Sequence, residues 1–316
     1  MEKFVNTKLL YRYRKVTNYS IEELMNDELV LSSADTFNDS HDMTIGYNLE
    51  TVSEFLLKSD LFIRAMSNDT KRTKSFDDRY IYLKSKRGQH VVMEFANILC
   101  VDAIKRLKTK FLVGCFTHKN TNQVMWSHYA DYGKGFLVGY KQSEIVRAIK
   151  NDNEWNVKDL FNNVKYSYKV FDASKMLADS IIESCSDNHI GNYYKIFIDS
   201  FISLDKAYDN LFIKNPVWQH EKEIRLLMFD KNQEKNSHRI VAKLKPSVVI
   251  MGEDISLSNK YLLVSICKNK NIPIMIAESC YKNNKYELCV RPLLSIEIEN
   301  LLKEFKDILK LDGLAQ

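Results

Sequence analysis

The chain has 316 residues, of which 45% are hydrophobic and 28% are charged, and its formal net charge is +5 at pH 7. This composition is typical of a globular protein with a sizeable core, and the mild positive charge does not indicate a dedicated duplex-binding protein. The chain contains only 9 glycines and 4 prolines, and neither GxGxxG nor GxxxxGK[ST] occurs in it. The two common nucleotide-binding fingerprints are therefore excluded.

The first residues, MEKFVNTKLL, contain no apolar signal core, and no run of about 18 apolar residues follows them. We therefore expect a cytoplasmic protein without a membrane partner. Six cysteines are scattered along the chain without a CxxC pair. This spacing suits no zinc site, so we expect reduced thiols.

The hydrophobic pattern predicts a single α+β domain over residues 1–316, with a mixed central sheet. Ser20 and Glu23 have the spacing of a capping box and predict a helix over about 21–27. Helical periodicity dominates 48–110 and 169–213, which we interpret as helical insertions, and a last helix is expected over 293–311. The expected strands of the sheet are 8–13, 29–33, 111–117, 134–140 and 221–229.

Near the C-terminal end of this series, Glu221, Glu223 and Arg225 occupy alternate positions. On a strand these side chains project to one face at about 7 Å spacing, so two carboxylates and a guanidinium line one surface. The structural alternative is a row of solvated ion pairs, each worth about 0–1 kcal/mol.

A second stretch, from Met125 to Ala130, is expected to form a short helix or turn. Its Trp126 and Tyr129 share a helix face, where they pack on the core or stack on a planar ligand. Adjacent residues do not face each other, so Ser127 and His128 are not expected to form a nucleophile pair. A lone histidine such as His128 is more often structural than catalytic.

A third stretch combines Tyr11-Arg12-Tyr13 with a later Phe37-Asn38-Asp39 loop, in which Asn-Asp is commonly an Asx turn or a helix cap. The chain resembles a bacterial family, domain of unknown function twenty-nine seventy-one. The resemblance rests on four motifs that occur in this order: the Tyr-basic-Tyr strand, the Phe-Asn-Asp loop, Trp-x-His-Tyr-Ala and Trp-x-x-Glu-x-Glu-x-Arg. The resemblance runs from about Lys8 to Tyr286. Ser40 departs from the family pattern, which usually has proline there, and this concerns the stiffness of the loop. By association with accessory-genome proteins, the family suggests a toxin or a phage-defence effector.

The layout is also similar to that of ADP-ribosyltransferase folds, a likeness at the level of the fold. It implies NAD as the substrate, with Glu223 offsetting positive charge on the ribose as nicotinamide leaves and Glu221 acting on the acceptor. Arg12 then neutralises the diphosphate, and a tyrosine stacks on nicotinamide. The expected catalytic residues are Glu223, Glu221 and His128, and the expected cofactor-binding residues are Tyr11, Arg12, Tyr13, Asn38, Trp126, Tyr129 and Arg225.

We expect Arg12, Asn38, His128 and Glu223 to line one concave site. If Glu223 stabilises the transition state, Glu223→Gln lowers turnover rather than stability. The acceptor and the oligomeric state are left open.

Two alternatives belong to other function classes. In a metal-dependent nuclease, Asp39, Asp42, Glu221 and Glu223 converge on magnesium. In a non-enzymatic protein, the aromatic and basic residues bind a nucleic acid or another ligand by stacking, and the Glu-x-Glu-x-Arg row serves as scaffold.

Overall fold

The computed structural model describes residues 9–39, 41–67, 76–151, 161–186, 189–230 and 238–311. Its strands are β1 (Leu9–Arg14), β2 (Glu28–Ser33), β3 (Phe111–Thr117), β4 (Phe136–Lys141), β5 (Phe161–Asn163), β6 (Lys165–Tyr166), β7 (Cys185–Ser186), β8 (His189–Ile190), β9 (Ile213–Lys214), β10 (Glu223–Phe229), β11 (His238–Lys243), β12 (Val248–Gly252), β13 (Ile274–Lys282) and β14 (Lys285–Pro292).

The α-helices are α1 (Asn18–Met25), α2 (Leu49–Lys58), α3 (Asp60–Ser67), α4 (Phe76–Lys84), α5 (Lys86–Lys108), α6 (Gln123–Tyr129), α7 (Gln142–Asn151), α8 (Ser174–Glu183), α9 (Tyr193–Ser203), α10 (Asp205–Asp209), α11 (Leu257–Lys270) and α12 (Ser295–Leu311). Short 3-10 turns are η2 (Ala34–Thr36), η3 (Asp131–Gly133), η4 (Asn210–Phe212) and η5 (Pro216–Glu221).

Ten of the described strands form one mixed sheet in the order β11-β2-β3-β1-β4-β12-β13-β14, with β10 pairing with both β3 and β5. The β12–β13 pair is parallel and the other pairs are antiparallel. The prediction that the five early and central strands share one mixed sheet is confirmed, and so is the α+β class.

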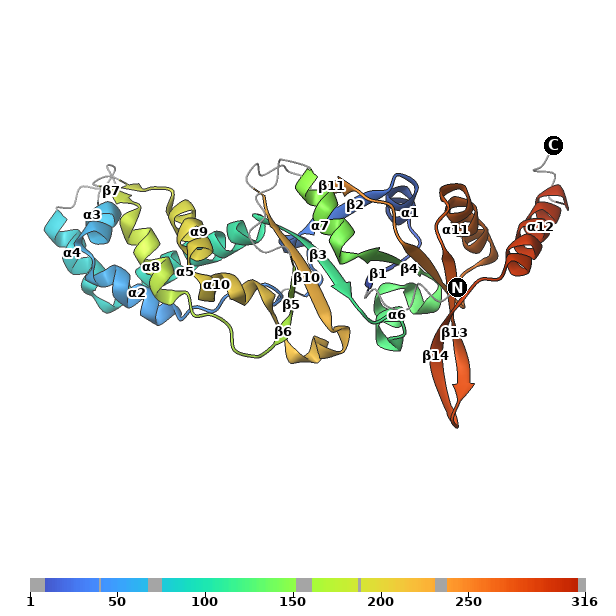
Figure 1. The fold of residues 1–316 in the computed structure, drawn as a ribbon. Helices are drawn as coiled ribbons and strands as arrows, with labels where there is room; N and C mark the ends of the chain where they lie inside the picture. Colours follow the sequence, from blue (N-terminus) through green and yellow to red (C-terminus); the bar gives the residue numbers. More distant parts are fainter. Residues whose placement is uncertain are drawn as a thin grey trace.

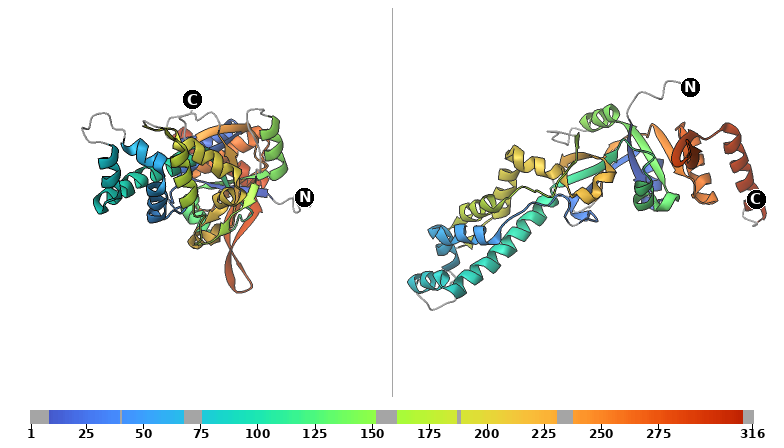
Figure 2. Two further views of the ribbon diagram at one scale, coloured as in Figure 1. Left: turned by 90° about the vertical axis from the view of Figure 1, so that its left-hand side faces the viewer. Right: turned by 90° about the horizontal axis from the view of Figure 1, so that it is seen from below.

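The molecule is elongated, with the sheet in the middle (Figures 1 and 2). Helices α2 to α5 and α8 to α10 gather at one end, within the ranges predicted as helical. They enclose a core of their own that includes Leu56, Phe62, Val92 and Phe197, and this core reaches the sheet at Phe111 of β3. At the other end, α11, α12 and the β13–β14 hairpin extend from the sheet (Figure 1).

The sheet itself carries a core on each face. The larger one includes Leu10, Leu31 and Val249, together with Ile145 of α7 and Leu263 of α11. A smaller cluster beside α6 joins Tyr13 and Trp126 to strands β4 and β12. Strand β1 therefore contributes alternate residues to both faces, as period-two alternation requires.

Strand β3 is incompletely paired on one of its sides. On one side, strand β10 pairs with β3 along the whole length of β3, from Phe111 to Thr117. On the opposite side, β2 pairs with β3 only at residues 112–113, and β1 pairs with it only at Thr117, within the described residues. Residues 114–116 thus face an opening in the sheet, and this opening positions the site described below.

The cysteine expectation was wrong for one pair. Cys280 of β13 and Cys289 of β14 are joined by a disulfide across the hairpin, whereas Cys100, Cys115, Cys185 and Cys267 are free. Antiparallel pairing brings these two residues together although nine positions separate them in the sequence. None of the described helices combines the length and the apolar character needed to cross a bilayer.

Candidate functional site

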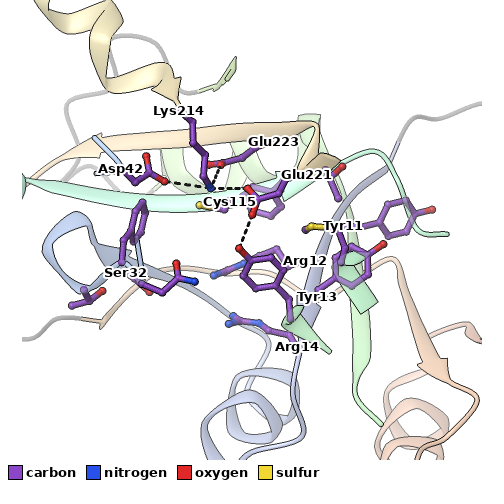
Figure 3. A pocket seen from close by; sticks show the side chains of 17 residues that line it. Tyr11, Arg12, Tyr13, Arg14, Ser32, Asp42, Cys115, Lys214, Glu221 and Glu223 are labelled. Atoms are coloured by element: carbon purple, nitrogen blue, oxygen red, sulfur yellow. Dashed lines mark hydrogen bonds and ion pairs between the residues drawn. The ribbon is translucent and has the colours of Figure 1, made fainter. Parts of the chain in front are cut away.

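A cavity of about 320 Å³ occupies the opening between β1, β2 and β3. Its lining comes from β1, the end of β2, residues 36–38, Asp42, β3, α6, β9, the end of η5 and the start of β10. Figure 3 shows Tyr11 and Arg12 on one side and Glu221 and Glu223 on another. Segments that are up to about two hundred residues apart in sequence meet here because the sheet separates at β3.

A buried ion cluster forms one wall of the cavity. We use this name for the side chains of Asp42, Lys214, Glu221, Glu223 and Arg225, all of which are buried. Lys214 lies at its centre, with Nζ at 2.6 Å from Glu221 Oε2, 3.0 Å from Glu223 Oε2 and 3.3 Å from Asp42 Oδ2. The convergence of three carboxylates on one ammonium is visible in Figure 3.

Arg225 completes the cluster below the cavity. Its Nε donates to Glu223 Oε1 at 2.8 Å, and its Nη2 donates to both oxygens of Asp42 at 3.0 and 3.1 Å. Its Nη1 donates to the Leu211 carbonyl oxygen at 2.6 Å. A guanidinium that is 0% exposed is thus hydrogen-bonded through all three of its nitrogens, which offsets the cost of burying its charge.

The electrostatics of the cluster keep Glu223, Lys214 and Arg225 charged. Burial by itself raises the pKa of Glu223, but the charges of Arg225 and Lys214 outweigh that effect and lower it to about 2. Burial lowers the pKa of Lys214 and Arg225, yet the neighbouring carboxylates raise both above their ordinary values. With all members ionised, three carboxylates face two cations, and the cluster has a formal charge of −1.

Two tyrosine hydroxyl groups contact the glutamates of the cluster from outside it, one at a carboxylate and one at a backbone N–H. Tyr129 Oη donates to Glu221 Oε1 at 2.6 Å, and Tyr166 Oη accepts from the backbone N–H of Glu223 at 2.9 Å. Burial raises the pKa of Tyr129, and its hydrogen bond to Glu221 raises it further. The Tyr129 hydroxyl is therefore a proton donor to Glu221 at neutral pH.

The cysteine of β3 also belongs to this wall. Cys115 is exposed to the cavity and lies opposite Arg225 in the β3–β10 register. Burial within the protein raises the pKa of its thiol, and the Glu223 carboxylate raises it further. The thiol is therefore protonated at neutral pH and is not activated as a nucleophile.

The opposite wall carries the aromatic and cationic residues of β1. Arg12 Nη1 donates to the Val30 carbonyl oxygen at 2.6 Å, and the guanidinium lies 5.5 Å from the centre of the Phe116 ring. The Tyr11 ring packs over Gly139 of β4, where an added Cβ would come within 3.0 Å of it. A side chain at position 139 would displace this ring.

Most of the predicted site residues meet at this cavity. Its lining includes the following predicted residues: Tyr11, Arg12, Tyr13, Asn38, Tyr129, Glu221 and Glu223. Three predicted residues are absent from the lining. Arg225 lies beneath it in the buried ion cluster, and Trp126 is buried, with its ring edge-on to Tyr13 at 5.4 Å. His128 is exposed near Trp218 and His220, so its expected place in the concave site was wrong.

Glu221 reaches the cavity by a different route from the predicted one. It ends η5, which Pro216 begins, and Lys222 then adopts a left-handed conformation at φ 47° before β10 starts at Glu223. The predicted alternation therefore holds for Glu223 and Arg225 but not for Glu221. Ser40 of the Phe-Asn-Asp loop lies outside the described residues.

The geometry does not suit the magnesium site of the nuclease alternative. Lys214 Nζ occupies the point on which Asp42, Glu221 and Glu223 converge, and Asp39 instead accepts from Trp218 Nε1 at 2.8 Å. Within the described residues, no group of three or more histidine, cysteine or acidic side chains is arranged to hold a metal ion. An ammonium thus fills the position that a metal requires.

Sequence comparison identifies the part of the chain that includes much of this wall. Residues 125–226 match the model of a family described as "Protein of unknown function (DUF2971)". This segment is therefore similar to the DUF2971 family. The match covers less than half of the chain, from α6 to the middle of β10. The suspected resemblance to DUF2971 is confirmed over this range.

The DUF2971 segment contributes Tyr129, Lys214, Glu221, Glu223 and Arg225 to the site, whereas β1, residues 36–38 and Asp42 lie outside the match. No curated protein and no solved structure matches the chain. The similarity to ADP-ribosyltransferase folds therefore stays a prediction.

Two members of the site were missed or misplaced by sequence reasoning. Lys214 lies on the two-residue strand β9, which pairs with β6, and no motif distinguishes it from the other lysines of the chain. For Asp42 the sequence suggests only the role of a metal ligand in the nuclease alternative. Its role as the partner of Arg225 depends on a contact 183 positions away in the sequence, for which a single sequence has no signal.

Proposed function

We propose that the chain binds NAD in this cavity and cleaves the bond between nicotinamide and ribose, as an ADP-ribosyltransferase-like enzyme. The observation that carries the proposal is the opposed polarity of the cavity walls. One wall is the buried ion cluster, with its surplus negative charge, and the other carries Arg12 together with Tyr11 and Tyr13. NAD combines the matching groups, namely a cationic nicotinamide ring, an anionic diphosphate and planar bases.

The acidic wall suits the charge that moves during the reaction. In NAD the nicotinamide ring is formally positive, and positive charge develops on the ribose as the C1′–N bond breaks. A fixed negative charge beside this bond stabilises the transition state. Because the pKa of Glu223 is lowered, its carboxylate stays ionised and available for this purpose.

The basic wall suits the diphosphate. Arg12 uses one guanidinium nitrogen for the Val30 carbonyl oxygen, and its side chain donates to no other acceptor among the described residues. The remaining N–H groups match a pair of phosphate oxygens. The cavity volume lies at the lower end of the range for small-molecule sites. We therefore expect it to enclose the nicotinamide half of the dinucleotide.

The proposed reaction with water conserves atoms and charge. The C1′–N bond breaks, and nicotinamide leaves as a neutral molecule with the bonding electron pair. A water oxygen bonds to C1′ and releases one proton, giving ADP-ribose. With an acceptor nucleophile in place of water, the same step transfers ADP-ribose to that acceptor.

A second candidate, ligand binding without cleavage, is favoured by one observation. Glu221 and Glu223 are each 3% exposed, and their oxygens already accept hydrogen bonds from Tyr129, Lys214 and Arg225. Carboxylates held in this way act as a fixed electrostatic wall but are poorly placed to take up a proton from an acceptor. A protein that senses a nucleotide would need only the wall.

The test separates binding from cleavage. We would measure NAD binding by calorimetry and nicotinamide release by liquid chromatography, for the wild type and for Arg12→Gln. Losing a charge-assisted hydrogen bond to phosphate is expected to weaken binding by about tenfold or more. Arg147→Gln, at an exposed arginine on α7, is the matched control and should bind as the wild type does.

Each result favours one account. Binding with nicotinamide release supports the transferase-like proposal, whereas binding without release under any condition supports the sensing alternative. If the wild type binds no NAD, or if Arg12→Gln binds it as tightly, the polarity of the cavity has been assigned to the wrong ligand.

A further inference from the structure

The β13–β14 hairpin projects from the body of the molecule at the end opposite the helical part (Figures 1 and 2). Its six outermost residues, from Tyr281 to Tyr286, are all exposed. This hairpin takes no part in the cavity described above.

Continuous strand pairing and a disulfide make the hairpin rigid. Eight registered pairs join its strands, and the Cys280–Cys289 disulfide links them covalently. The two turn residues, Asn283 and Asn284, both have positive φ, at 50° and 60°. Two consecutive left-handed residues match the twist of the flanking strands, so the turn holds the hairpin in register. A binding element that is already ordered loses little conformational entropy when it meets its partner.

The tip combines aromatic faces with positive charge. Tyr281 and Tyr286 are registered partners across the hairpin, with ring centres 5.1 Å apart, and are 62% and 79% exposed. Lys282 and Lys285 directly flank the turn, and no acidic residue occurs between the two tyrosines. Successive side chains of a strand point to opposite faces, so Glu287 projects from the face of the ribbon opposite the two tyrosines; Lys282 and Lys285 also project from that opposite face, next to the turn.

We propose that this hairpin tip binds single-stranded nucleic acid. Exposed tyrosine rings offer stacking faces to unpaired bases, and the two lysines that flank the turn attract the phosphate backbone as the strand passes the tip; single-strand-binding surfaces combine these two kinds of side chain. In a duplex the base faces are covered by their neighbours, so stacking of this kind requires unpaired bases. The positive net charge of the chain, +5, acts in the same direction.

The experiment uses the full chain and a fluorescein-labelled oligothymidine of about twenty nucleotides, long enough for one such site. Binding is followed by fluorescence anisotropy at about 50 and 200 mM salt. The wild type should bind at the lower salt and weaken at the higher. The double substitution Tyr281→Ala/Tyr286→Ala should weaken binding by at least about tenfold, because stacking contributes to affinity base by base.

The matched control is Tyr19→Ala/Tyr168→Ala, which removes two tyrosines that are 80% and 76% exposed elsewhere on the surface. It should bind as the wild type does. Lys282→Gln/Lys285→Gln should reduce the slope of log affinity against log salt by about 1.4, since each of two phosphate contacts on a single strand contributes about 0.7. All of these positions are exposed, so the melting temperatures should not change.

Three outcomes would overturn the proposal. The first is no anisotropy change for the wild type at the lower salt. The second is unaltered affinity in both tip variants. The third is that the protein binds anionic lipid vesicles but no oligonucleotide, and that the tip substitutions abolish the vesicle binding. This result would assign the tip to a membrane surface instead. None of these results depends on whether the cavity binds NAD.

Discussion

Replacing Lys214 by methionine tests whether the buried ion cluster is held together by charge balance. In the wild type, Lys214 contacts three carboxylates within 3.3 Å, and the cluster has a formal charge of −1. Lys214→Met changes that charge to −2 and leaves Arg225 as the only cation of the cluster. Glu223→Gln changes the formal charge to zero, and Lys214 and Arg225 both keep a contact with Asp42. The two substitutions break the same contact but should differ in cost.

The magnitudes follow from the contacts. Removing one partner of a buried ion pair costs about 3–5 kcal/mol, and Lys214→Met removes the shared partner of three carboxylates, so we expect at least this loss. An unfolding entropy of about 2.1 cal/mol/K per residue makes 1 kcal/mol worth about 1.5 °C in a chain of 316 residues. Lys214→Met should therefore lower the melting temperature by about 5–8 °C. Glu223→Gln should cost about 1–3 kcal/mol, the range for a broken buried hydrogen bond.

Thermal melting at pH 7 of the two single variants and of Lys214→Met/Glu223→Gln provides the assay. The double variant restores the formal charge of −1, so its loss should be smaller than the sum of the single losses by about 0.5–3 kcal/mol. The reasoning is refuted if Lys214→Met costs no more than Glu223→Gln, or if the two losses simply add. Because Glu223 is buried in this cluster, its substitution changes stability as well as any turnover, so a rate effect must be corrected for folded protein.

Three further predictions concern the same region. The pKa of Glu223 is lowered from 4.5 to about 2, so its charge stabilises the fold above about pH 4.5. This contribution is lost as the pH falls towards 2. The melting temperature of the wild type should therefore fall more steeply between pH 4.5 and 2 than that of Glu223→Gln. Gly135→Ala places a Cβ 2.2 Å from the Arg14 carbonyl oxygen, so we expect a loss of about 1–3 kcal/mol or more, and an unchanged melt would contradict this close contact. Tyr129→Phe removes the hydrogen bond from the Tyr129 hydroxyl to Glu221 and should lower the free energy of unfolding, measured with denaturant, by about 1–3 kcal/mol. An unchanged free energy of unfolding would show that this hydroxyl is dispensable.

Strand positions were predictable because alternation is a local property. Each of the five predicted strands lies within a few residues of an observed one, and Glu223 and Arg225 share a face as expected. The first helix was less accurate. It begins at Asn18, since Thr17 and Ser20 form the capping box, and Glu23 is instead the ion-pair partner of Arg14. Two overlapping pairs with capping-box spacing compete in this stretch, and the pattern does not indicate which pair caps the helix.

The partners within the site were not predictable from one sequence. No local motif distinguishes Lys214 or Asp42 in the sequence, and their contact joins residues that are 172 positions apart. The motif containing Trp126, His128 and Tyr129 was recognised as a unit, yet one short helix directs these side chains to three different environments: the core, the exterior and the cavity. Motif membership therefore indicated the region of the site but not the orientation of each side chain.

The opening beside β3 has a mechanical consequence. On the cavity side, the part of the sheet built on β1, β4 and β12 is tied to the part built on β2, β3 and β10 through one registered pair, Tyr11 with Thr117, among the described residues. On one face of the sheet, a continuous core joins both parts through Leu10, Leu31 and Phe116. Separating the two parts at the cavity thus breaks few backbone hydrogen bonds, while the shared core keeps them in contact, so the two parts can rotate slightly relative to each other about this core. We expect the amides around Tyr11 and Thr117 to exchange with solvent faster than those in the centre of β10, and a bound ligand that touches both walls to slow them.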